Sequence, residues 1–341
     1  MRIAILDPLR FFAALSVVFY HYFARFELEA PTLLQPVAKF GYLGVPLFFI
    51  ISGFVIALSA ENRGALHFAY LRFMRLYPVY WIAILFTTII ATLTGHSHIP
   101  VMQLAANGTM LNDYLGFADI DGVYWTLKAE LKFYACVFLL LATGLFNKYY
   151  LWLTIWTAMS VTHLLFKQPL FMGWFITPHY SPFFISGVLF YLIRKNNGNM
   201  LTYILLGVNF ITALVRASSQ IDGFVIAPDM ADKVVAAIVI SSFFTFFLLV
   251  SLQRISIKTS RIWLTLGGIT YPLYLIHNVV GISIIEILSK VMNYQLAAAI
   301  MIPVITLTSL ILHLYLEKPF VAWFKKKTAP LLAVIRKPAL T

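Results

Sequence analysis

The apolar run at residues 5–26 is long enough to cross a bilayer, yet it contains Asp7, Arg10 and His21. An ionisable side chain near the bilayer centre costs about 2.5–3.5 kcal/mol, so such side chains usually face the protein interior or a water-filled cavity. Arg10 and His21 are eleven positions apart, which on a helix leaves them roughly 20° from alignment and about 16 Å apart along the axis. We therefore predict that this helix forms one wall of a polar passage, with Asp7 placed to pair with Arg10.

The composition identifies an integral membrane protein. Of 341 residues, 61% are hydrophobic and 11% are charged, whereas a soluble domain carries about 25% charged residues. The net charge of +12 does not indicate nucleic acid, because the cations cluster at the edges of apolar runs. We expect the lipid bilayer, and no nucleic acid, as a partner. The single Cys136 excludes an internal disulfide, and the charges in 5–26 argue against a cleaved signal peptide.

Apolar runs of spanning length recur along the whole chain. They lie at residues 5–26, 41–60, 72–94, 123–146, 149–166, 174–193, 200–219, 232–252, 262–288 and 295–323. We predict an all-α integral membrane protein with about ten transmembrane helices. Residues 1–325 would form one multi-pass membrane domain, and residues 326–341 a short basic cytoplasmic tail.

Loop charges orient these helices, because cytoplasmic loops are enriched in Lys and Arg. If the N-terminus is cytoplasmic, that side receives sixteen cations: Arg2, Arg63, Arg72, Arg75, Lys148, Arg194, Lys195, Arg254, Lys258, Arg261, Lys318, Lys325, Lys326, Lys327, Arg336 and Lys337. The other side receives six: Arg25, Lys39, Lys167, Arg216, Lys233 and Lys290. This bias predicts that both termini are cytoplasmic.

Two loops on the predicted outer side are acidic. Residues 95–122 include Asp113, Asp119 and Asp121 but no Lys or Arg. This is the longest connection, so we expect it to cover an outward-facing site. The loop 220–232 adds further aspartates.

Several polar side chains within or beside the spans are candidate site residues. Arg72 and Arg75 lie one helical turn apart. They are either a fork that binds phosphate or ordinary cytoplasmic cations that fix the membrane topology. Glu130 points about 200° away from Lys128 and from Lys132 along its helix. It is predicted at a depth similar to that of His21, so either a His–Glu site or a structural role is open.

The remaining polar side chains favour structural roles. Ser52 lies in a glycine-rich run typical of close helix packing, and its surroundings are not those of a nucleophilic serine. His277 is either a second catalytic group or, as we favour, a hydrogen-bonded structural histidine. His96 and His98 alone are weak evidence for a metal site, and we expect no metal.

Together these motifs resemble the membrane acyltransferase-3 family, bacterial enzymes that O-acylate cell-surface polysaccharides. The resembling segments are Leu6–Arg10 with Tyr20-His21, Gly41–Phe54, Arg72-Phe73-Met74-Arg75, Trp125–Tyr134, Tyr271–His277 and Glu317–Phe320. They occur in order across almost the whole chain. Lys128 and Lys132 depart from the family pattern, which more often has small or neutral polar residues there.

The resemblance implies a bacterial inner-membrane O-acyltransferase. Its donor would be cytoplasmic acyl-CoA, most simply acetyl-CoA, with no permanently bound cofactor. Its acceptor would be an extracytoplasmic glycan such as O-antigen, lipopolysaccharide or exopolysaccharide. Arg72, Arg75 and Arg10 would bind the donor, and Arg10 would also be one of the catalytic residues, with His21 and Glu130. His21 would act as general base or carry the acyl group, and Glu130 would orient His21 or the sugar. The oligomeric state stays open.

Two other classes of protein remain as alternatives. A proton-coupled transporter or flippase would also need buried His, Glu and Arg, although the sequence has no internal repeat. A sensor or scaffold subunit would not need the buried charges.

Overall fold

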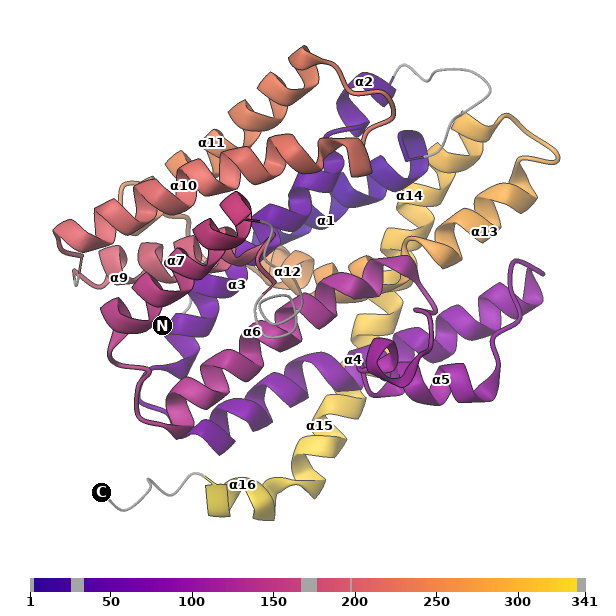
Figure 1. Ribbon diagram of the computed structural model, residues 1–341. Coiled ribbons are helices and arrows are strands. Elements are labelled where there is room, and N and C mark those ends of the chain that lie inside the picture. The colour runs from indigo at the N-terminus through magenta and orange to yellow at the C-terminus, as the bar shows by residue number, and fades with distance from the viewer. Residues whose placement is uncertain (1–2, 26–33, 167–176, 197, 336–341) are drawn as a thin grey trace.

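The computed structural model describes residues 3–25, 34–166, 177–196 and 198–335, and within these ranges it contains helices and no strands. The predicted all-α fold class is therefore confirmed. Figure 1 shows the elements α1 (Leu6–Phe23), α2 (Gln35–Ala38), η1 (Gly41–Leu43), α3 (Gly44–Ala60), α4 (Ala65–Leu93), α5 (Val101–Gly108), η2 (Asn112–Leu115), η3 (Gly122–Tyr124), α6 (Trp125–Ala142), α7 (Tyr149–Phe166), α9 (Ser181–Arg194), α10 (Met200–Gln220), η4 (Ile221–Gly223), α11 (Met230–Ser251), α12 (Arg261–Ile276), α13 (Val279–Leu288), α14 (Tyr294–Ile311), the π-helix η5 (Leu312–Glu317), α15 (Lys318–Lys327) and α16 (Ala329–Ile335).

Every predicted span contains helix in the described ranges. The stretches Gln35–Ala60, Ala65–Leu93, Met200–Gly223, Met230–Ser251 and Tyr294–Lys327 are each long and apolar enough to cross a membrane. The pair α12 and α13, bent by 69°, makes a sixth span if it is counted as one. The protein is thus a multi-pass helical membrane protein. The count of ten spans and the cytoplasmic termini stay predictions.

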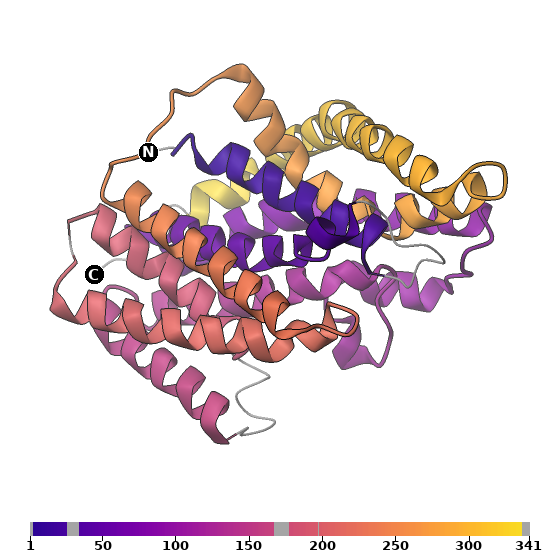
Figure 2. The same ribbon diagram turned by 90° about the horizontal axis from the view of Figure 1, so that it is seen from above.

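The other predicted spans differ from simple lipid-facing helices for identifiable reasons. Helix α6 includes Lys128, Glu130 and Lys132, which lower its hydropathy. Helix α9 has only 14 residues, but its side chains are buried from Ser181 to Ile193. It is enclosed by α3, α7, α10 and α11, and Figure 2 shows α10 and α11 running side by side along one edge of the bundle.

Glycines let the central helices approach closely, as the Gly41–Phe54 pattern predicts. A Cβ added at Gly53 would lie 2.0 Å from the carbonyl oxygen of Phe184 on α9. A Cβ at Gly187 would lie 2.2 Å from the carbonyl oxygen of Ile50 on α3. Because any larger residue would force these helices apart, the prediction of close packing by small residues is confirmed.

The loop 95–122 folds against its own neighbours in the chain. Its helix α5 is tied to α4, since Trp81 Nε1 donates to the Gly108 carbonyl at 2.9 Å. Lys128 Nζ on α6 holds the following turn through Asp113 at 2.6 Å and Asp119 at 2.9 Å. Lys128, which departs from the family pattern, is therefore neutralised by the acidic loop.

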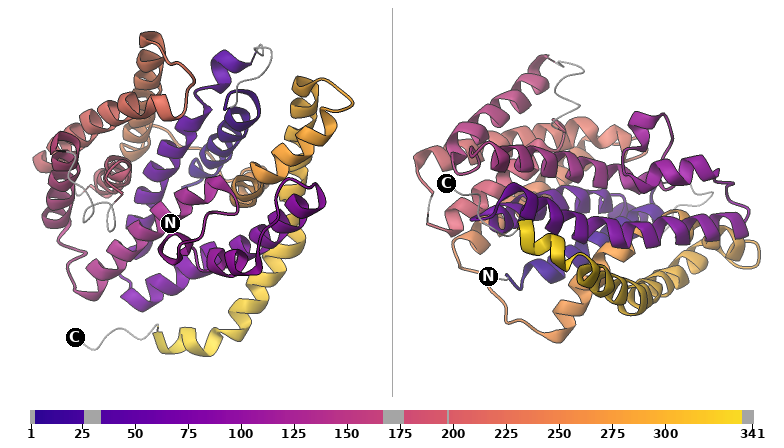
Figure 3. Two further views of the ribbon diagram at one scale, coloured as in Figure 1. Left: turned by 45° about the vertical axis from the view of Figure 1, so that its right-hand side comes forward. Right: turned by 90° about the horizontal axis from the view of Figure 1, so that it is seen from below.

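The chain leaves the bundle through a hooked C-terminal segment. Figure 3 shows α13 pairing with α14, and α15 and α16 turning away at the opposite end of α14. The boundary predicted between residues 325 and 326 falls inside α15. Four cations of the charge count lie outside the described residues: Arg2, Lys167, Arg336 and Lys337. The same holds for residues 174–176 of the predicted span 174–193 and for residues 336–341 of the predicted tail.

Candidate functional site

Two polar cavities lie along α1. The first, the arginine cavity, has a volume of about 750 Å³ and is lined by Arg10, Arg72 and Arg75 among others. The second, the histidine cavity, has a volume of about 490 Å³ and includes His21 in its wall. Val45 and Tyr274 line both cavities, so these two side chains stand where the cavities approach each other.

Helix α1 contributes to both cavities, as expected of the wall of a polar passage. Arg10 lies in the arginine cavity and His21 in the histidine cavity. Asp7 Oδ1 is 3.8 Å from Arg10 NH1, which confirms the expected ion pair. Asp7 in turn packs against Gly267 of α12, where a Cβ would lie 2.7 Å from Asp7 Oδ1. The glycine therefore allows the carboxylate to sit beside Arg10.

The arginine cavity has an excess of positive charge. Its walls include the cations Arg10, Arg63, Arg72, Arg75, Lys318 and Lys325, and the acids Asp7, Glu130 and Glu317. Six cations against three acids favour an anionic ligand.

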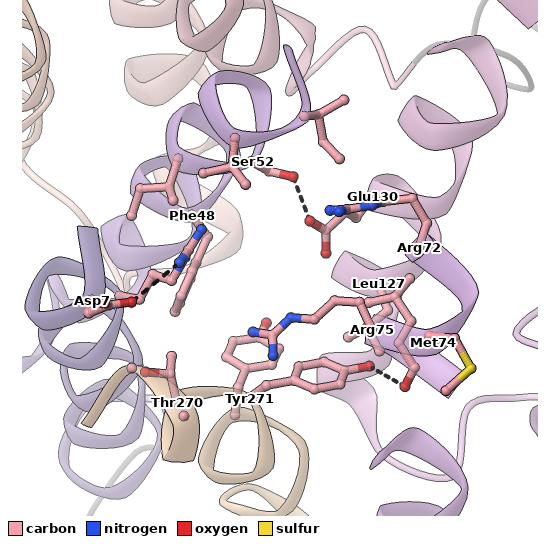
Figure 4. Close-up of a pocket in the computed structure, with 18 of the residues that line it drawn as sticks. Asp7, Phe48, Ser52, Arg72, Met74, Arg75, Leu127, Glu130, Thr270 and Tyr271 are labelled. Carbon is pink, nitrogen blue, oxygen red and sulfur yellow. Dashed lines mark hydrogen bonds and ion pairs between the residues drawn. The ribbon is translucent and has the colours of Figure 1, made fainter. Parts of the chain in front are cut away.

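Aromatic rings hold two of these arginines, as Figure 4 shows for Arg75 above Tyr271. The guanidinium carbon of Arg75 is 5.5 Å from the centre of the Tyr271 ring, and that of Arg72 is 5.7 Å from the centre of the Tyr134 ring. Arg72 Nε is buried and has no hydrogen-bond partner among the described residues. A guanidinium that interacts with a ring through its face still presents in-plane N–H groups, which match phosphate oxygens.

Glu130 also lies in the arginine cavity, where Figure 4 shows its carboxylate directed to Ser52. Its Oε1 accepts hydrogen bonds from Ser52 Oγ and Tyr134 OH, both at 2.5 Å. The structure does not bring Glu130 and His21 together. Trp125 at the start of α6 lines the histidine cavity, but Glu130 is more than one turn further along that helix and faces the other cavity.

The arginine cavity also contains a buried His–Glu pair that the sequence motifs did not predict. His313 Nδ1 lies 2.6 Å from Glu317 Oε2, and both residues belong to the π-helix η5. The His313 ring fills the space beside Gly268, where a Cβ would lie 2.4 Å from Nε2. Single-turn π-helices are frequent at functional sites. The four-residue spacing of His313 and Glu317 was the available signal.

His21 is almost fully buried, with 5% of its surface exposed, and has three polar neighbours. Arg25 NH1 lies 2.8 Å from His21 Nε2. On the other side of the ring, His21 Nδ1 lies 2.9 Å from the Val17 carbonyl oxygen and 3.1 Å from His277 Nε2. The imidazole is thus fixed at both nitrogens.

The histidine cavity is covered by a different loop from the one we expected. Residues Asp222 to Pro228 line it, whereas Gly122 is its only lining residue from 95–122 among those described. Tyr20 OH donates to the Phe224 carbonyl at 2.8 Å, and the Phe224 ring stacks on Tyr42 with 4.6 Å between centroids. The expectation that 95–122 covers the site is therefore wrong, because Lys128 and α4 hold that loop elsewhere.

Asp121, at the end of the acidic loop, has a structural task instead. Its carboxylate accepts from Asn278 Nδ2 at 2.7 Å and from the Val279 backbone N–H at 2.8 Å, which caps the start of α13. Tyr22 OH donates to the His277 carbonyl at 2.8 Å on the other side of the same bend. Burial raises the pKa of the Asp121 carboxyl, while its hydrogen bonds act in the opposite direction. These contacts fix the bend that places His277 beside His21.

The described residues contain no group of three or more His, Cys, Asp or Glu side chains placed to hold a metal ion. His96, one of the two histidines weighed as metal ligands, instead contacts Glu286 at 3.1 Å.

Three curated proteins show what this chain is similar to. A protein of Acidianus two-tailed virus, ORF330, to which acetyltransferase activity is attributed, is 28% identical over 207 residues, covering 55% of this chain and 57% of the viral protein. Acyltransferase MdmB of Streptomyces mycarofaciens is 28% identical over 148 residues, covering 39% of this chain and 38% of that protein. Nodulation protein 10 of Rhizobium leguminosarum bv. viciae is 29% identical over 160 residues, covering 40% and 43%.

The chain matches between 38% and 57% of the length of these relatives. No solved structure matches it. The family model described as an acyltransferase domain matches residues 3–316, which include the lining of both cavities except for Glu317, Lys318, Val321 and Lys325 of the first. This chain belongs to the acyltransferase-3 family.

Proposed function

We propose that this protein is a membrane O-acyltransferase that moves an acyl group, most simply acetyl, from cytoplasmic acyl-CoA to a hydroxyl of an extracytoplasmic cell-surface glycan. The observation that carries the proposal is the pair of cavities on α1, one rich in arginine and one containing His21, which meet at Val45 and Tyr274. A phosphate-bearing donor suits the first cavity, and a hydroxyl acceptor suits the second.

The donor would enter the arginine cavity with its phosphates held by Arg72 and Arg75 at the mouth and with Arg10 deeper inside. Residues Arg10 and His21 are about 16 Å apart along α1, a distance comparable to the pantetheine arm. The carboxylate of Glu130, fixed by Ser52 and Tyr134, is placed to accept an amide N–H of that arm. Glu130 therefore remains a candidate site residue, but on the donor side.

The acceptor hydroxyl would reach His21 through the histidine cavity. His21 Nε2 takes the hydroxyl proton as the oxygen attacks the thioester carbonyl, the C–S bond breaks, and CoA leaves as a thiolate that is protonated to the thiol. If His21 carries the acyl group instead, its Nε2 first replaces the thiol and the hydroxyl then displaces the histidine. Both routes yield one ester and one CoA.

Transfer of an acyl group is supported by the relatives, two of which are named as acyl- or acetyltransferases. The finer elements of the proposal are the ten-span topology with both termini cytoplasmic, a bacterial inner membrane, acetyl-CoA as donor, and a glycan such as O-antigen or exopolysaccharide as acceptor. They rest on the loop charges and on the family resemblance.

Purified protein in sealed vesicles tests the proposal. The C-terminus is tagged, and protease accessibility of the tag defines which face is exposed. We expect labelled acetyl-CoA to be consumed only from the face with the Lys325–Lys327 cluster, and a glycan acceptor to be acylated only from the opposite face. Transfer with both substrates confined to one face would contradict the through-membrane mechanism. Movement of a solute or lipid without any acyl transfer would support the transporter or flippase instead.

A further inference from the structure

His277 is the buried neighbour of His21 that neither cavity reaches. Its exposed surface is 0%, and it does not line the arginine cavity or the histidine cavity. Its Nε2 lies 3.1 Å from His21 Nδ1, and the two ring centroids are 4.9 Å apart. A substrate in either cavity would therefore not contact His277 directly. His277 would act on a bound substrate through its hydrogen bond to His21.

The backbone carbonyls around the pair determine which nitrogens carry protons. His277 Nδ1 lies 2.8 Å from the Tyr274 carbonyl, and His21 Nδ1 lies 2.9 Å from the Val17 carbonyl. A carbonyl oxygen only accepts, so we assign the proton of each neutral ring to Nδ1. The His21 Nδ1–H is then shared between the Val17 carbonyl and His277 Nε2, and His21 Nε2 has its lone pair directed to Arg25 at 2.8 Å.

The bend between α12 and α13 holds His277 in this orientation. Tyr22 OH fixes the His277 carbonyl, and Asp121 fixes the next two residues, Asn278 and Val279. Gly281 is required beside this contact, since a Cβ there would lie 1.8 Å from Tyr22 OH. The pair of histidines is therefore held from three separate parts of the chain.

We infer that His277 is a positioning residue for His21. It holds the proton of the neutral His21 ring on Nδ1, so that Nε2 carries the lone pair that takes the acceptor proton, and it stabilises the imidazolium formed in the reaction. The inference rests on the proposed function. As the hydroxyl proton moves to His21 Nε2, the hydrogen bond from His21 Nδ1–H to the neutral His277 Nε2 strengthens, and no proton leaves the pair. When CoA thiolate is protonated, the proton on Nε2 is released and His21 returns to its starting tautomer. A carboxylate has this role in the serine protease triad.

Other polar groups near His21 contribute to the same electrostatic environment. They are Tyr20 on α1, Arg25 just after α1, Tyr42 on η1, Asp121 before η3, Asp222 on η4, Tyr274 on α12 and His277 just after α12. Because all but His277 stay in place when only position 277 changes, variants there isolate its contribution.

The test compares His277→Gln with His277→Asn in otherwise unchanged full-length protein. The Gln amide reaches roughly to the position of His Nε2 and can accept from His21. The Asn amide reaches only to the position of Nδ1, so it keeps the contact with the Tyr274 carbonyl but cannot reach His21. Both variants are polar and of smaller or similar size, and thermal unfolding in detergent checks that each is folded.

We expect His277→Asn to lower kcat for acetyl transfer by about 10²-fold with an unchanged KM for acetyl-CoA, and His277→Gln to stay within about tenfold of wild type. The acid limb of kcat/KM should move to lower pH in His277→Asn, because an imidazolium that keeps only the Val17 carbonyl as acceptor at Nδ1 releases its proton more readily. The limb should stay in place in His277→Gln. Equal losses in the two folded variants, or a limb that does not move, would overturn the positioning role while leaving the transferase intact. Absence of transfer by the wild-type protein would instead overturn the proposed function, and with it this inference.

Discussion

Arg10 and His21 leave the same helix about 16 Å apart and line different cavities, one with Arg72 and Arg75, the other with Arg25 and Tyr42. A single straight helix thus joins the two halves of the site, and the side chains between the cavities are Val45 and Tyr274. Substitutions in the donor half, in the acceptor half and where the two cavities meet should therefore have different effects.

His21→Ala should remove acyl transfer while the protein still inserts and purifies, because His21 is the base or acyl carrier of the proposed reaction. Loss of a general base typically costs about 10²–10⁴ in rate. His96→Ala is the matched control, since His96 lies outside both cavities and contacts Glu286. Retention of more than about a tenth of the wild-type rate would exclude the catalytic role of His21.

Arg72→Ala and Arg75→Ala should weaken the binding of free CoA more than they slow the bound donor, because phosphate contacts are remote from the reacting carbon. Lysine at either position should restore binding only in part, as it lacks the bidentate guanidinium. Titration with CoA measures the effect. Arg261→Ala, an exposed arginine at the start of α12 that lies outside both cavities, should bind CoA normally. Equal affinity in all variants would identify Arg72 and Arg75 as topology anchors.

Gly267→Ala should impair both stability and donor binding, because the new methyl group would lie within 2.7–2.9 Å of the Asp7 side chain and displace it from Arg10. Overpacking of this kind typically costs about 1–3 kcal/mol. Gly207→Ala on α10 is the control: nothing lies within 4 Å of its added Cβ, so helix propensity should stabilise it by up to about 1 kcal/mol. Thermal unfolding and CoA titration of both variants measure the difference. A folded Gly267→Ala protein with normal CoA affinity would show that Asp7 does not position Arg10.

Val45→Ala should widen the place where the cavities meet and allow longer acyl groups to reach His21. The measurement is the ratio of butyryl to acetyl transfer from the corresponding CoA esters, which we expect to rise severalfold above the wild-type ratio. Val55→Ala removes the same atoms from α3 but opens only the arginine cavity. A similar ratio in both variants would show that acyl length is selected elsewhere.

The sequence by itself determined the membrane class, the helical runs and the polar residues of α1. Hydropathy and spacing suffice for these features because they depend on residues close together in the chain. For the same reason, the Asp7–Arg10 pair and the close packing at Gly53 followed from local patterns.

Only the tertiary structure decided which polar residues meet. Glu130 was expected near His21 from its depth, but rotation about α6 and its bonds to Ser52 and Tyr134 place it in the arginine cavity. His277 reaches His21 across 256 positions of sequence because α12 ends in a bend that Asp121 and Tyr22 hold. Such contacts depend on how helices pack and where they break, which the hydrophobic period of any single helix does not specify.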